Sequence, residues 1–148
     1  MFEKINVFLK KYVGNNKGNE IVAFVLVLPF LILPIANTVN MLTDLVIYDT
    51  MRQAAREALL RMEIEGGLTG DGLYALEGYL QSKGLDMNKV NIDYTPYPVK
   101  YGDEVRVRVS YEYKARRYTI GLGGIRRVDE NETMVYGPLS SVSKKYER

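Results

Sequence analysis

The pattern of hydrophobic positions is dominated by one uninterrupted apolar run over residues 21–36 (IVAFVLVLPFLILPIA). Mild polarity follows, in asparagine and threonine, and no charged residue lies between Glu20 and Asp44. A helix over residues 21–42 would measure about 33 Å, which is enough to cross a bilayer core of about 30 Å. A secretory signal peptide is disfavoured, because the helical pattern continues without a small-x-small cleavage site. The pattern therefore predicts a membrane span over residues 21–42.

Beyond this run the sequence keeps a helical period and becomes amphipathic. The apolar face is formed by Ile47, Tyr48, Met51, Ala54, Ala55, Ala58, Leu59 and Met62, and Leu60 lies outside it. The pair Gly66-Gly67 supplies the left-handed C-cap that ends a helix. We therefore expect one long helix over residues 19–66, in which residues 43–66 form an amphipathic continuation of the span.

Two prolines, Pro29 and Pro34, lie inside the predicted span. Each removes a helical hydrogen bond and leaves a carbonyl oxygen unpaired one turn earlier. Membrane helices tolerate prolines when neighbouring helices or local rearrangement satisfy the freed groups. The spacing is typical either of a weak, deformable helical segment or of simple kinks.

Residues 67–148 predict a small domain with one short helix and a sheet. A helical pattern covers residues 71–84, with Thr69 or Asp71 as N-cap. The period then changes to 2, which predicts strands over residues 90–94, 103–113 and 132–136. We expect Gly137-Pro138 to end the last strand and residues 140–148 to fray. The fold class is α+β, a long N-terminal helix packed on a small antiparallel sheet.

Composition narrows the functions that this chain can perform. The net charge is +2, which argues against nucleic acid as a partner. The chain has no cysteine and no histidine, so it lacks the thiol nucleophile, the commonest general base and the commonest transition-metal ligand. We expect no enzyme activity, no cofactor and no metal site. The lysines in residues 1–18 precede the apolar run, so the positive-inside rule predicts a cytoplasmic N-terminus and an external domain over residues 67–148.

Four local motifs could mark a binding or modification site, but for each of them an ordinary loop, turn or solvated surface is favoured. Gly121-Leu122-Gly123-Gly124 predicts an inter-strand loop, because no P-loop lysine follows. Residues 129–132 (DENE) predict an acidic solvated turn rather than a calcium site. Asn131 begins an N-x-T glycosylation sequence. Two arginine pairs make one basic end, suited to solvent or to an acidic partner: Arg116-Arg117 and Arg126-Arg127.

Three sequence features together resemble a known family. They are Gly18 before the run FVLVLP (24–29), the segment AAREA (54–58) near the helix end, and the strand RVRVSYEYK (106–114). With the basic leader, this plan resembles the type IV pilin-like proteins, and more specifically the TadE-like pseudopilins of tight-adherence (Tad/Flp) pili. The resemblance implies a structural subunit of an extracellular filament or of its assembly machinery. Its partners would be membrane lipid, other pilin-like subunits and a prepilin peptidase.

The resemblance also assigns roles to particular residues. Aligned on Pro29, the prepilin-peptidase cut would lie between Gly18 and Asn19. Packing in a helix bundle would use one set of residues: Phe24, Val27, Pro29, Leu31 and Pro34. Where the family has a glutamate, this chain has Ala23, and the nearest carboxylate is Glu20. Either Glu20 takes over the role of the assembly carboxylate, or the chain stays uncleaved as a single-pass membrane anchor whose external domain binds a partner.

Overall fold

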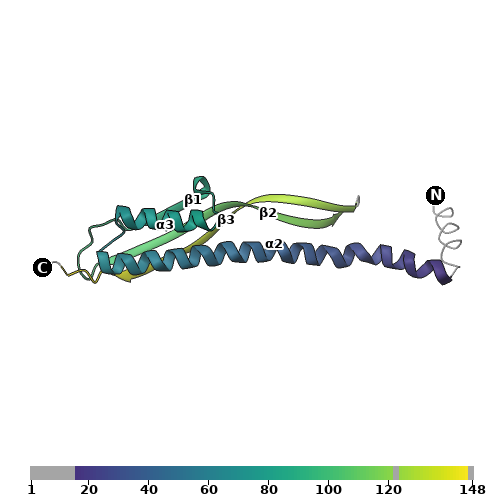
Figure 1. Cartoon of the computed structure of the whole chain (residues 1–148), viewed down its shortest axis with the longest axis horizontal. Coiled ribbons are helices and arrows are strands. Elements are labelled where there is room, and N and C mark those ends of the chain that lie inside the picture. Colours follow the sequence, from purple (N-terminus) through teal and green to yellow (C-terminus); the bar gives the residue numbers. More distant parts are fainter. Residues whose placement is uncertain (1–15, 122–123, 147–148) are drawn as a thin grey trace. The chain divides into compact units, whose positions relative to one another are not determined.

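The computed structural model describes residues 16–121 and 124–146, with side chains from residue 20 onward. The elements follow in the order shown in Figure 1: α2 (Asn16–Glu65), α3 (Gly70–Ser82), the 3₁₀ turn η1 (Met87–Lys89), β1 (Val90–Tyr94), β2 (Glu104–Gly121) and β3 (Gly124–Val142). The predicted basic leader lies mostly outside the described residues. The predicted α+β class is confirmed: one long apolar helix is combined with a small three-stranded antiparallel sheet in a pilin-like arrangement.

The chain forms two compact units, and both α2 and the β2–β3 hairpin contribute to each of them. The first unit combines α2 up to Asn40 with Arg116–Val128. The second combines Met41–Ala115 with the chain from Asp129 onward. The helix α2 is continuous through Pro29 and Pro34, so neither proline breaks it.

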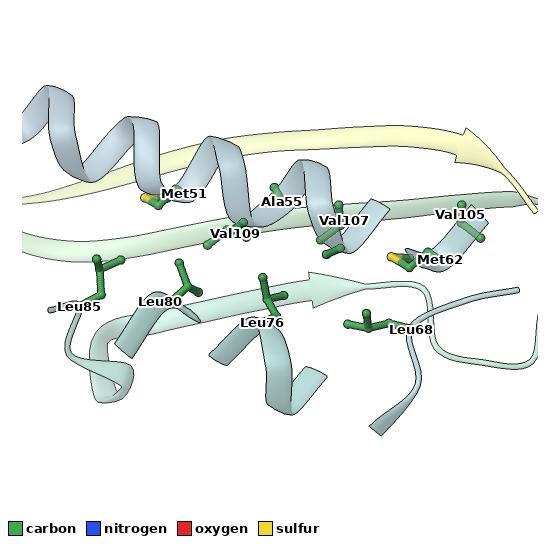
Figure 2. Close-up of a cluster of buried hydrophobic side chains, with 12 residues drawn as sticks. Met51, Ala55, Met62, Leu68, Leu76, Leu80, Leu85, Val105, Val107 and Val109 are labelled. Atoms are coloured by element: carbon green, nitrogen blue, oxygen red, sulfur yellow. The ribbon is translucent and has the colours of Figure 1, made fainter. Parts of the chain in front are cut away.

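The second unit contains the hydrophobic core. The predicted apolar face of α2 is buried there, since Met51, Ala55 and Met62 have no exposed surface. Figure 2 shows these side chains packed against two further groups. One is formed by leucines in α3 and in the residues just before and after it, and the other by the valines of β2. Burying a methionine, leucine or valine side chain stabilises the fold by about 1.5–3 kcal/mol. Tyr48 is the exception on the predicted face: it is 41 % exposed and stacks edge-on against Tyr136.

The ends of the two α-helices follow the predicted chemistry. The backbone N–H groups of Gly66 and Gly67 both donate to the Met62 carbonyl oxygen at 2.9 Å, and both glycines have positive φ. At the start of α3 the hydroxyl of Thr69 accepts from the Gly72 N–H at 3.2 Å, which identifies Thr69 as the N-cap. These contacts fix the direction in which the chain leaves α2 and enters α3.

The sheet has the strand order β1-β2-β3. β1 pairs antiparallel with β2, from Val90 opposite Tyr111 to Tyr94 opposite Val107. The predicted alternation along β2 is confirmed, because Val105, Val107 and Val109 are fully buried while the arginines between them are exposed. The valine face therefore covers the apolar face of α2 within the second unit.

The two long strands exceed their predicted bounds, and this corrects three expectations. β2 continues past Tyr113 to Gly121, and β3 already begins at Gly124. The acidic residues 129–132 lie inside β3, so the predicted solvated turn is wrong. Pro138 does not end β3, which continues to Val142; β3 is an edge strand, the position in a sheet at which proline is tolerated.

The C-terminal segment is held in place up to residue 146, so the prediction that it frays is wrong. Ser143 is 1 % exposed, and its N–H donates to the Asp103 carbonyl oxygen at 2.8 Å. The next backbone N–H, that of Lys144, donates to the Glu63 carbonyl oxygen at 2.6 Å. The Glu63 carboxylate also accepts from the Ser141 hydroxyl and from the Lys144 ammonium. These bonds tie the chain end to the last turns of α2.

Candidate functional site

The candidate functional surface is the apolar half of α2 in the first unit. The large side chains from Ile21 to Leu28 are all substantially exposed, up to 67 % at Ile21. By length and composition, α2 is the one helix among the described residues that is suited to cross a membrane. Exposed apolar surfaces of this extent mark sites of contact with other proteins or with membranes.

The two sides of this helix differ. At about 100° per residue, one face collects the predicted assembly carboxylate and four of the predicted packing residues: Glu20, Phe24, Val27, Leu31 and Pro34. All five are exposed. The fifth predicted packing residue, Pro29, is half-buried and lies on the other side, where Leu33 is only 7 % exposed. We call the five-residue face the open stripe.

The predicted processing site lies at the N-terminal end of α2. Gly18 and Asn19 belong to the helix, and the structure describes their backbone only. Glu20 is exposed at the start of the open stripe. The structure therefore places Glu20 on the same face as the predicted packing residues, while cleavage after Gly18 stays a prediction.

The side chain of Asn37 joins α2 to β2 in the first unit. Its amide nitrogen donates to the Tyr118 carbonyl oxygen at 2.9 Å, and its carbonyl oxygen accepts from the Tyr118 N–H at 2.8 Å. A carboxamide has the same hydrogen-bond donor and acceptor as a peptide group, so the Asn37 side chain pairs with Tyr118 of β2 as the backbone of an adjacent strand would. We call this pair of bonds the Asn37 clip. The sequence marks it only as a polar residue within an apolar stretch.

Both predicted arginine pairs lie in strands of the first unit. Arg116-Arg117 lies in β2 and Arg126-Arg127 in β3. Ile120 and Ile125 lie between the arginine pairs and the chain reversal that joins β2 to β3, and their side chains are 52 % and 54 % exposed. We call the segments 116–121 and 124–128 the hairpin tip. It combines exposed apolar and basic side chains beside the apolar helix.

Several acidic residues of the second unit form ion pairs with nearby basic side chains. Within the described parts of the chain, no group of three or more His, Cys, Asp or Glu residues could hold a metal ion. The carboxylate with the clearest structural role is Glu63, whose side chain is 14 % exposed. Hydrogen bonds from Lys144 and then from Ser141 lower the pKa of Glu63 below its ordinary value of 4.5. Asn131 is exposed on β3, and its glycosylation stays a prediction.

Comparison of the chain with protein-family models, with curated proteins and with solved structures finds no match. The class of protein is therefore defined by the fold and the exposed surface. The chain has one apolar helix, long enough to span a membrane, whose second half packs on a three-stranded antiparallel sheet in a pilin-like arrangement.

Proposed function

We propose that the chain is a structural, pilin-like subunit of a Tad-type or related extracellular filament, or of the machinery that assembles it. One observation carries the proposal: the open stripe on α2 is exposed, while the opposite side of the same helix carries buried Leu33 and the Asn37 clip. A helix that keeps an apolar stripe exposed, while its own chain is attached on the other side at Leu33 and Asn37, is suited to pack against copies of itself or related helices.

The proposed mechanism is an exchange of one apolar environment for another. In the membrane, lipid surrounds residues 21–42, the N-terminus lies in the cytoplasm and the sheet domain lies outside. In a filament, neighbouring helices replace the lipid, and the domain coats the surface. Lipid chains and packed helices are similarly apolar, so the exchange requires no large desolvation. Glu20 would supply the assembly carboxylate at the start of the stripe.

The substitution Val27→Asp tests this mechanism in the full chain. A charge in the open stripe would have to be buried in the helix bundle, so we expect filaments to be lost. An aspartate at the centre of a span costs about 2.5–3.5 kcal/mol on insertion, so the amount of protein in the membrane fraction must be measured alongside. Isolated surface filaments are counted by electron microscopy.

The matched control is Leu60→Asp. Leu60 is 59 % exposed and lies on the solvent side of α2 in the second unit. This variant should form filaments normally. Normal filaments in the Val27→Asp variant would contradict the proposal, whereas membrane-inserted protein without filaments would support it.

The second candidate is a membrane anchor that is never cleaved and whose external domain binds a partner. One observation favours it: Ala23 occupies the position where the TadE-like family has its glutamate. Mass spectrometry of the protein purified from membranes decides between the two. A mature N-terminus at Asn19 favours the filament subunit, and an intact Met1 favours the anchor.

A further inference from the structure

The hairpin tip has an uneven distribution of charge and apolar surface. Residues 116–128 contain four arginines and no acidic residue. In both strands the exposed isoleucine lies nearer the turn than the arginine pair: Ile120 follows Arg116-Arg117, and Ile125 precedes Arg126-Arg127. The tip therefore has an apolar end backed by a band of positive charge. This order is typical of segments that enter a membrane interface, with the apolar part in the acyl chains and the basic part at the phosphates.

The Asn37 clip fixes the position of the hairpin tip along the axis of α2. Tyr118 is bound to Asn37, so the strands between Tyr118 and the turn lie beside the apolar part of the helix. One turn earlier on the same face, Leu33 is 7 % exposed, while Leu31 and Ile32 are 56 % and 50 % exposed. The hairpin tip and this part of α2 belong to the same compact unit, which fits with the tip covering Leu33. The apolar end of the tip thus reaches at least one turn below Asn37.

The length of the helix places that position at a membrane surface. Lys17 and Asn37 are twenty residues apart in α2, which corresponds to about 30 Å and matches the bilayer core. A hairpin tip with arginines cannot lie near the bilayer centre, where charged side chains are costly. At the surface, Arg116 and Arg126 meet phosphates, and the two isoleucines meet the upper acyl chains.

We propose that the hairpin tip is a membrane-surface anchor, which inserts Ile120 and Ile125 into the interface and binds anionic phospholipid headgroups through Arg116 and Arg126. The bilayer leaflet is the one from which α2 emerges, and the span shifts by about one turn toward the N-terminus relative to residues 21–42. The anchor rests on the membrane insertion of α2, which is part of the proposed function, and it does not require filament assembly.

Single-cysteine labelling of the full chain tests the anchor, because the natural sequence has no cysteine. The chain is reconstituted into vesicles of phosphatidylcholine and phosphatidylglycerol with an environment-sensitive fluorophore at one of three sites. Ile125→Cys reports on the tip, Thr133→Cys on a distant exposed position of the same strand, and Val27→Cys on the span. We expect the labels at 125 and 27 to be shielded several-fold from iodide relative to the label at 133. Lipid-borne nitroxides near the headgroup should quench the label at 125.

The three sites separate failure of the anchor from failure of the proposed function. If the label at 125 is as accessible to iodide as the label at 133 while the label at 27 is shielded, α2 is inserted and the anchor is wrong. If the label at 27 is also in water, α2 is not inserted, and the proposed function fails together with the anchor.

The charge requirement is tested by the double variant Arg116→Gln/Arg126→Gln, labelled at residue 125. The shielding of the label from iodide should fall several-fold in this variant. It should fall likewise when the chain that keeps all its arginines is placed in vesicles of phosphatidylcholine alone. The control, Arg56→Gln/Arg108→Gln, removes two exposed arginines of the second unit and the same charge, and should leave the shielding unchanged. If neither the tip variant nor the neutral lipid changes the shielding, the arginines do not bind lipid headgroups and the proposal is overturned.

Discussion

At the scale of single residues, Gly67 shows how closely the turn after α2 approaches the loop before β2. It has a φ of +109°, and an added Cβ would lie 2.8 Å from the Pro96 carbonyl oxygen and from the Tyr97 backbone nitrogen. Both contacts are with backbone, which has little freedom to move away. We expect Gly67→Ala to destabilise the fold by about 1–3 kcal/mol, measured by chemical unfolding of the full chain in detergent.

Gly78 provides the matched control for this prediction. It lies inside α3 with no atom within 4 Å of an added Cβ and with no positive φ. Gly78→Ala should therefore stabilise the protein by about 0.5–1 kcal/mol, because alanine is the better helix former. Equal effects of the two substitutions would show that the turn at Gly67 is not as tight as the structure indicates.

Glu63 makes the stability of the second unit dependent on pH. Its pKa is lowered in the folded chain by hydrogen bonds from Lys144 and Ser141, so the folded state binds its proton less readily than the unfolded state. The resulting stabilisation is present above the ordinary pKa of 4.5 and is lost as the pH falls through the lowered value in the folded chain. We expect Glu63→Gln to lower the unfolding free energy at neutral pH by about 1–2 kcal/mol.

The pH profile separates this effect from a loss of packing. The difference in unfolding free energy between the natural chain and Glu63→Gln should begin to shrink near pH 4.5, where the carboxyl of the unfolded chain becomes protonated, and should vanish as the pH falls through the lowered pKa of the folded chain. A difference that stays constant from neutral to acid pH would mean that the charge of Glu63 is not what stabilises the C-terminal segment.

At the scale of elements, the Asn37 clip holds β2 against α2 in the first unit. Asn37→Ala removes the side chain that binds the Tyr118 N–H and carbonyl oxygen, at a cost of about 1–2 kcal/mol for the two bonds. We expect hydrogen exchange of the Tyr118 amide to accelerate by tenfold or more, as about 1.4 kcal/mol corresponds to a factor of ten.

The neighbouring threonine serves as the control for the clip. The Thr38 hydroxyl donates to the Pro34 carbonyl oxygen at 2.8 Å, within the helix itself. Thr38→Ala should leave exchange at Tyr118 unchanged. If Asn37→Ala also leaves it unchanged, the clip does not hold the strand.

The elements differ in how far they can be predicted from sequence. The second half of the long helix, α3, β1 and the valine part of β2 follow from periodicity, because each has a more buried and a more exposed face, whereas the first half of the helix follows from its uninterrupted apolar run. The outer parts of β2 and β3 carry exposed side chains on both faces, for example Arg116 and Arg117, and so show no alternation. Their extent depends on pairing between strands, and the clip depends on a contact between Asn37 and Tyr118 across 81 residues. Local sequence does not encode either feature.

At the scale of the whole molecule, one helix contributes to both units. Its second half packs the sheet domain through Met51, Ala55 and Met62, while its first half keeps the open stripe exposed. Because the packed face and the open stripe do not share residues, the domain can stay folded while the surroundings of the first half change from lipid to neighbouring subunits. This separation is the physical basis of the proposed filament subunit.

The central claim, that the open stripe packs against neighbouring subunits, is tested most directly by photo-crosslinking in surface filaments. Single cysteines replace Leu31 in the stripe or Leu26 on the opposite side, which are 56 % and 65 % exposed, and each carries a benzophenone. The label at 31 should crosslink to the α2 helix of another subunit, identified by mass spectrometry, in several-fold higher yield than the label at 26. Equal yields at the two positions, or no crosslink at 31, would contradict the claim.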